Sequence, residues 1–169
     1  MSVALFTVVV TISVGTLLAL INANQKAQSL KSVINNLNFA LESMSRTIRT
    51  GRLYHCTGSI PSTLPAGVAD CANGNVGLVL TDDRGVRLAY GYDGTTSIWR
   101  SIGDGSSWIA LTAPDVFIKD MLFYVTGTGV GDAFQPTVTI SIRGHVGPKE
   151  STDSSFNIET SVVQRVLDE

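Results

Sequence analysis

Hydrophobic residues dominate the start of the chain. Between residues 2 and 21 there is no charged side chain, and most of the side chains are aliphatic. About 20 residues with a rise of ~1.5 Å each match the roughly 30 Å hydrocarbon core of a bilayer. This run therefore predicts a helix that can span a membrane, and we expect residues 1–24 to form its transmembrane part.

Residues 25–51 have a different pattern, which is typical of a helix with one apolar face. Their apolar members recur at spacings of three and four and so form one stripe: Leu30, Val33, Ile34, Leu37, Leu41, Met44 and Ile48. A stripe of this kind packs against another element. Gly51 is a suitable helix stop, and Arg46 and Arg49 complement the negative end of the helix dipole. We predict one helix over residues 2–50, roughly 70 Å long.

Beyond Gly51 the hydrophobic period shortens towards two, and turn residues become frequent. Asp-Gly pairs at 93–94 and 104–105 separate short apolar runs and favour hairpins, because glycine tolerates positive φ. The predicted strands cover residues 76–80, 86–92, 97–101, 107–111, 116–125, 137–143 and 156–167. We therefore expect residues 52–169 to form a β-rich head. The predicted fold class is α+β, with a long N-terminal helix packed on an antiparallel β-sheet.

The composition agrees with a chain that lies partly in lipid. Of the 169 residues 44% are hydrophobic and only 15% are charged, and the mean hydropathy is +0.24. The net charge of −2 offers no basic face of the kind that nucleic acids require. We therefore expect no direct binding of nucleic acid.

Cys56 and Cys71 are the only cysteines, and they lie in a stretch rich in Gly, Ser, Pro and Asn. In an exported head they would be joined, and closing a loop of about 15 residues would stabilise the fold by about 3 kcal/mol. The alternative is two separate thiols in a cytosolic protein. Neither cysteine belongs to a CxxC or Cys/His cluster, so we predict no metal and no cofactor.

Candidate catalytic residues are few. His55 and His145 are the only histidines, and the sequence shows no partner for a triad or a metal site beside either one. Asp82 and Asp83 are neighbours in a predicted turn, where adjacent side chains face different ways. Three turn carboxylates could ligate calcium, although none lies in a dense acidic loop: Asp82, Asp93 and Asp104. We therefore expect no enzymatic activity and no catalytic residue.

Two further groups have structural explanations. Gly127, Gly129 and Gly131 form a glycine-rich loop, but a strand follows it rather than a helix whose N-terminus could hold phosphate. Four aromatic residues could form a binding face, and packing of the hairpins against each other explains them about as well. These residues are Tyr90, Tyr92, Trp99 and Trp108.

Several segments resemble the type IV pilin superfamily. SVALFTVVVTISVG at residues 2–15 is similar to the apolar part of a prepilin helix, and SRTIR at 45–49 resembles the end of that helix in minor pilins and pseudopilins. Four head segments are similar to the head of the minor pilins and pseudopilins of the W and J type. They are YGYD, IWR, LT and VFI, which begin at residues 90, 98, 111 and 116. FNIETSVVQR at 156–165 resembles their closing strand. The order of these segments along nearly the whole chain carries the resemblance.

The resemblance implies a minor structural subunit of a type IV pilus or a type II secretion-like pseudopilus. Such a subunit is stored in the bacterial cytoplasmic membrane with its head exported, and it then packs with other subunits into a cell-surface or periplasmic filament. Residues 3–21 would serve membrane storage and helix bundling, and residues 30–48 would hold the head. The family's basic leader, Gly-Phe processing point and nearby glutamate are missing ahead of Ser2, so we expect the true start to lie upstream.

Two other functions remain open at this point. One is a single-pass membrane protein whose exported head binds a ligand without polymerising, and a plain start without a Gly-Phe junction would favour it. The other is an anchored hydrolase that uses His145 or Asp82, which requires a pocket with converging polar groups.

Overall fold

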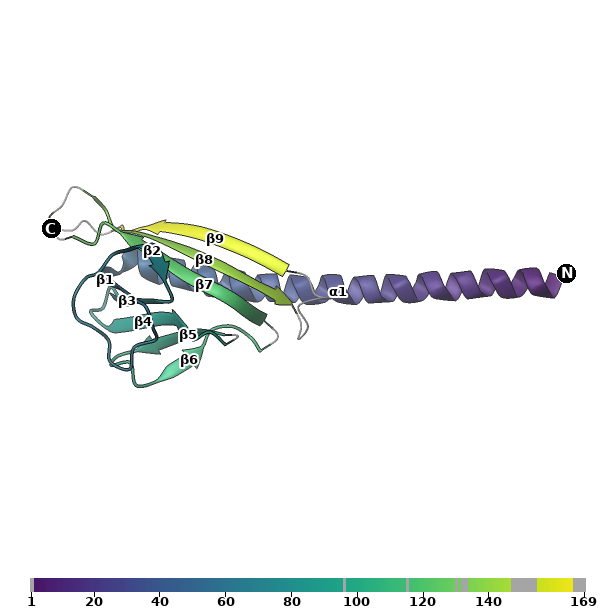
Figure 1. The fold of residues 1–169 in the computed structure, drawn as a ribbon, viewed down its shortest axis with the longest axis horizontal. Helices are drawn as coiled ribbons and strands as arrows, with labels where there is room; N and C mark the ends of the chain where they lie inside the picture. Colours follow the sequence, from purple (N-terminus) through teal and green to yellow (C-terminus); the bar gives the residue numbers. More distant parts are fainter. Residues whose placement is uncertain are drawn as a thin grey trace.

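The computed structural model describes residues 2–95, 97–114, 116–129, 131, 134–146 and 155–165. One helix, α1 (Ser2–Thr50), contains 49 residues and reaches far beyond the head (Figure 1). Its C-terminal half lies against the strands, whereas its N-terminal half projects alone.

Strands make up the rest of the regular structure within the described residues. Their bounds are β1 (Arg52–Thr57), β2 (Cys71–Asn75), β3 (Gly77–Thr81), β4 (Arg87–Tyr92), β5 (Ile98–Ile102), β6 (Trp108–Ala110), β7 (Val116–Thr126), β8 (Thr137–Val146) and β9 (Ser155–Val163). They form a five-stranded sheet in the order β1-β3-β4-β5-β6 and a four-stranded sheet in the order β2-β7-β8-β9. Neighbouring strands are antiparallel throughout both sheets. The predicted α+β fold class is therefore confirmed, with two sheets where the sequence suggested one.

The sequence prediction missed β1 and β2. For β1 a signal existed, because Tyr54 and Cys56 are spaced by two with the polar His55 between them, and both are buried in the structure. For β2 there was none, since Gly74 and Asn75 favour turns. This strand forms through its pairing with β7, and its register breaks between Cys71 and Asn75.

The last predicted strand ends earlier than expected. β9 stops at Val163, after which the backbone N–H of Gln164 donates to Pro136 O (2.9 Å) and that of Arg165 donates to Arg49 O (2.8 Å). The chain thus leaves the strand to contact the end of α1. Residues 166 and 167 of the predicted strand lie outside the described residues.

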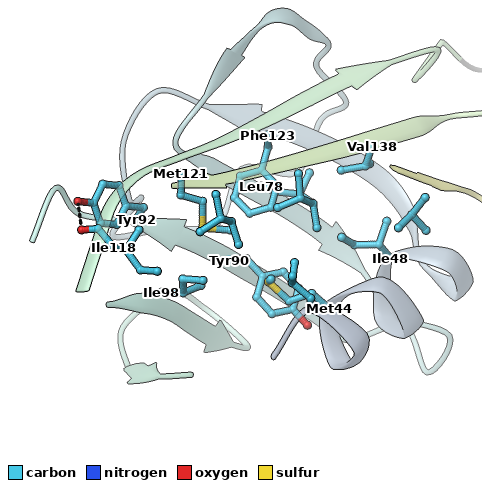
Figure 2. Close-up of a cluster of buried hydrophobic side chains, with 14 of the residues drawn as sticks. Met44, Ile48, Leu78, Tyr90, Tyr92, Ile98, Ile118, Met121, Phe123 and Val138 are labelled. Carbon is cyan, nitrogen blue, oxygen red and sulfur yellow. Dashed lines mark hydrogen bonds between the residues drawn. The ribbon is translucent and has the colours of Figure 1, made fainter. Parts of the chain in front are cut away.

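The core lies between α1 and the inner faces of both sheets (Figure 2). The helix contributes Met44 and Ile48, the five-stranded sheet contributes Tyr90, and the four-stranded sheet contributes Phe123 and Val138. All five are 0% exposed. The helix therefore completes a core that neither sheet could close alone.

The end of α1 is fixed by close packing and hydrogen bonds. A Cβ atom on Gly51 would collide with Leu80 Cδ1 and lie 3.0 Å from the backbone oxygen of Thr47, so a larger residue would displace the buried Leu80 side chain. The buried hydroxyl of Tyr54 lies 2.6 Å from Ile48 O, in the last turn of the helix, and 2.8 Å from Gly51 O, just beyond the helix, so its one proton is shared between these two carbonyl groups. These contacts satisfy backbone acceptors that a helix end otherwise leaves unpaired.

Candidate functional site: the exposed helix and the stapled head

The N-terminal half of α1 is exposed on every side. All side chains from residue 3 to residue 29 are exposed. An 18-residue window of this helix reaches a mean hydropathy of 2.5, and none of it is buried against the head. A core helix of similar composition would be covered by protein. The segment therefore has the length, the composition and the exposure of a membrane anchor.

Between residues 3 and 21, four hydroxyl groups each bond to the backbone of their own helix. Thr7 donates to Ala4 O (2.8 Å), Thr11 to Thr7 O (2.8 Å), Ser13 to Val9 O (2.8 Å) and Thr16 to Ser13 O (2.9 Å). Hydroxyl groups satisfied in this way do not need water, which reduces the free-energy cost of placing them in lipid.

Small side chains recur every four residues along one side of this half. The row consists of Thr7, Thr11, Gly15, Ala19 and Ala23. Residues four apart lie on the same helix face, and a Cβ atom added at Gly15 would meet nothing within 4 Å. In membranes, rows of small residues let two helices approach closely. The exposed half can thus pack against other helices as well as against lipid.

The second half of α1 turns one face to the head. Five residues of the predicted stripe are buried, namely Val33, Leu37, Leu41, Met44 and Ile48, and Leu30 and Ile34 are half-buried. Asn36 adds a polar contact, because its side-chain oxygen accepts the backbone N–H of Ala113 (3.1 Å). Phe39 is 77% exposed and does not share in this burial.

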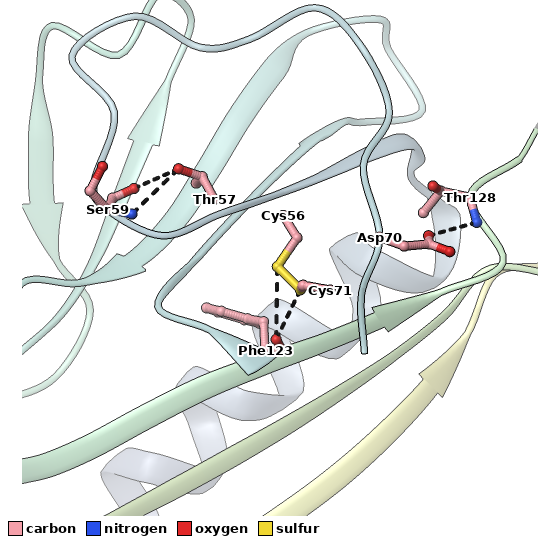
Figure 3. The surroundings of a disulfide bond; sticks show 7 residues. All are labelled: Cys56, Thr57, Ser59, Asp70, Cys71, Phe123 and Thr128. Carbon is pink, nitrogen blue, oxygen red and sulfur yellow. Dashed lines mark hydrogen bonds between the residues drawn. A yellow bond between two sulfur atoms is a disulfide. The ribbon is translucent and has the colours of Figure 1, made fainter. Parts of the chain in front are cut away.

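Cys56 and Cys71 form a disulfide bond, with their Cα atoms 5.9 Å apart (Figure 3). Cys56 lies on β1, an edge of the five-stranded sheet, and Cys71 lies on β2, an edge of the four-stranded sheet. Both sulfur atoms pack against Phe123 O, at 3.8 and 3.2 Å, and a bridged sulfur has no proton to donate. The predicted disulfide is confirmed, and it joins the two sheets in addition to closing the loop after the helix.

Asp70 binds the turn between β7 and β8 to the disulfide loop. Its carboxylate accepts the backbone N–H of Thr128 (3.0 Å), as Figure 3 shows, and also that of Gly127 (3.2 Å). Gly127 adopts a φ of 76°, a conformation that glycine allows at no steric cost. The amides of the glycine-rich segment thus bind a carboxylate of the chain itself. Sequence reasoning missed this contact, because the partners lie 57 and 58 residues apart.

The other acidic candidates cap separate turns. Asp82 accepts the backbone N–H groups of Arg84 (3.0 Å) and Val86 (2.8 Å). Asp93 accepts that of Thr95, and Asp104 accepts the N–H and hydroxyl of Ser106. The bonds from Ser106 lower the pKa of Asp104 below its ordinary value. Across the described residues, no group of three His, Cys, Asp or Glu side chains is placed to hold a metal ion.

The histidines and aromatic residues are spread over the head. His55 Nδ1 lies 3.2 Å from Gly67 O, while the ring of His145 stacks on Phe117 with centroids 5.4 Å apart. Tyr90 and Tyr92 are buried on the inner face of β4. Trp99 and Trp108 are half-buried on the opposite face of the same sheet. Trp99 pairs with Gly91, which lies between the two tyrosines, and with Ala110, two residues after Trp108, so both tryptophans face away from the tyrosines. The four aromatic residues therefore do not form one surface.

No family model, curated protein or solved structure matches this chain.

Proposed function

We propose that this protein is a structural subunit of a type IV pilus or a type II secretion-like pseudopilus, in the role of a minor subunit. It acts by assembly and not by catalysis. The observation that carries the proposal is the two environments of one helix: residues 3–29 are exposed, and the stripe from Leu30 to Ile48 is held in the head.

The proposed cycle has two stages. Before assembly the apolar half of α1 lies in the bacterial cytoplasmic membrane and the head is exported, where oxidising conditions maintain the Cys56–Cys71 bond. During assembly the same half leaves the lipid and packs with the helices of other subunits. The row of small residues centred on Gly15 supports this step because it permits close helix contacts.

Filament incorporation in the native cell tests the proposal. Shearing releases surface filaments, and immunoblotting then measures the protein in the filament and membrane fractions. We expect the wild-type chain in both fractions, and Gly15→Leu in the membrane but reduced at least about tenfold in filaments, since the larger side chain blocks close packing while raising hydropathy.

Leu17→Ile is the matched control, because it keeps both volume and hydropathy within the same apolar half, and we expect it to behave as wild type. A wild-type protein confined to the membrane fraction in cells that make filaments would contradict the proposal. That result would favour the anchored binding domain instead.

A further inference from the structure

The four sheet edges of the head differ in how they are protected against strand pairing. An edge strand exposes unpaired N–H and C=O groups, which short length, bulges, proline or charge normally shield. β1 has a register irregularity and a φ of 55° at Leu53, and β2 has a register break. β6 has only 3 residues. β9 has 9 residues paired to β8 without a register shift, no proline, and Glu159 as its only charged side chain.

The hydrogen-bonding pattern shows which groups of β9 point outward. Gln164 donates to Pro136 O (2.9 Å) and continues the β8–β9 register by one residue. Bonded and non-bonded pairs alternate in an antiparallel ladder, so the even-numbered residues of β9 bond to β8. The Thr139 and Ser161 hydroxyl groups, 2.8 Å apart, agree with this, since side chains approach more closely in non-bonded pairs.

The odd-numbered residues of β9 therefore present their N–H and C=O groups to the open edge. These residues are Ser155, Asn157, Glu159, Ser161 and Val163, and all five are exposed. Just beyond the strand, the outward N–H of Arg165 already donates to Arg49 O. Among the described residues, no backbone group of another segment forms a hydrogen bond with the outward edge of residues 155–163.

Apolar surface lies beside this edge. Phe156 and Ile158 point to the inner face of β9 and are only half-buried, and Leu30 of α1 is half-buried against the same core. A strand added next to β9 would cover these side chains as well as the backbone groups. Hydrogen bonds and apolar burial would then act together, as they do when a peptide adds to a sheet.

We propose that β9 is a strand-addition site for an extended segment of a different protein, with alternating apolar and polar residues and a basic side chain opposite Glu159. Within the described residues Glu159 has no ion-pair partner. A cross-strand pair of opposite charge stabilises a ladder, whereas two like charges destabilise it.

The β9 strand of a second copy of this chain does not fit the site. β9 runs in the same direction as α1 (Figure 1), so antiparallel pairing of two β9 strands would point the two anchors in opposite directions. Two parallel β9 strands related by a twofold axis along the membrane normal would place the same residue of each strand at the same height. Each outward N–H would then face another N–H, and no hydrogen bond could form. This step rests on membrane anchoring by α1, which is part of the proposed function, whereas the open edge does not depend on it.

Peptide binding to the full chain in lipid nanodiscs tests the inference without any filament. The probe is a fluorescent nine-residue peptide of alternating Val and Thr with Lys at its centre, measured by fluorescence anisotropy. We expect saturable binding, with affinity at least about tenfold weaker for the same peptide with central Glu.

Two variants at one position separate the backbone from the side chain. Ser161→Pro removes an outward N–H but no bond to β8, and it should weaken binding at least about tenfold. Ser161→Ala loses the same contact with Thr139 but keeps the N–H, and it should bind as wild type. Three results would overturn the proposal: no saturable binding to wild type, equal binding by both variants, or β9-dependent dimers that exclude the peptide.

Discussion

At the scale of single residues, the head depends on a few contacts between segments that lie far apart in the sequence. The Cys56–Cys71 bond joins edge strands of two sheets, and Asp70 attaches the same loop to the β7–β8 turn. Both contacts lie beside β2, whose pairing with β7 has a register break. Loss of either one should therefore loosen the junction of the sheets more than the core beneath α1.

Cys71→Ser should lower the free energy of unfolding of the head by about 3 kcal/mol, because it releases the closed loop in the unfolded chain. Urea unfolding of the full chain in detergent, followed by the fluorescence of Trp99 and Trp108, measures this change. Membrane insertion should stay unchanged. Wild-type protein treated with a reductant is the control, and its free energy of unfolding should fall by a similar amount. Equal protease resistance of the variant and wild-type heads would contradict a stabilising role for the disulfide bond.

The pKa of Tyr92 should make the free energy of unfolding depend on pH in the alkaline range. Burial raises the pKa of its hydroxyl group, and the nearby carboxylates of Asp93 and Asp120 raise it further. The unfolded chain ionises near its ordinary pKa of about 10, so this contribution is complete below about pH 10 and is lost as the pH rises through the higher folded value.

Urea unfolding at several values from about pH 8 to about pH 11 should therefore show a steeper loss of stability for wild type than for Tyr92→Phe. The variant also lacks the hydrogen bond to Ile118 O (2.9 Å), so its stability should be lower at neutral pH. Parallel curves for the two proteins would contradict the raised pKa, because Tyr92 would then ionise equally in the folded and unfolded chains.

At the scale of elements, α1 is one helix with two kinds of surface. Leu37 and Phe39 provide a matched pair, because they are large apolar residues two positions apart, 0% and 77% exposed. Leu37→Ala should destabilise the head by about 2–5 kcal/mol through lost burial and a cavity, whereas Phe39→Ala should change stability by less than about 0.5 kcal/mol. Urea unfolding of both variants measures the difference, and equal losses would show that the stripe does not anchor the head.

The sequence predicts the elements with strong periodicity and misses those that depend on distant partners. The helix stripe and the Asp-Gly turns report local geometry, so α1 and the strands from β3 to β9 could be predicted within a few residues. The segment of β2 has turn chemistry and becomes a strand only beside β7. The division into two sheets could not be predicted, because it depends on β7 pairing with β2 and β8 and not with β6, which no local pattern indicates.

At the scale of the whole molecule, the exposed helix, the stapled head and the open β9 edge are three separate parts, to which we assign separate functions. In our proposal the helix serves membrane storage and filament packing, the head is the exported part of the subunit, and β9 binds an extended segment of a different protein. Each can be altered alone, since Gly15, Cys71 and Ser161 lie in three different parts of the chain. The helix is the part on which the proposed function depends.

A nitroxide scan of α1 in lipid vesicles tests the helix most directly. Single labels at successive positions from residue 3 to residue 48 report collision rates with oxygen, which enters lipid, and with an aqueous nickel chelate. We predict high oxygen and low nickel collision rates at all positions up to about residue 21, followed by a 3.6-residue period with protected positions at Val33, Leu37, Met44 and Ile48. High nickel collision rates throughout residues 3–21 would contradict the account, because the apolar half would then lie in water.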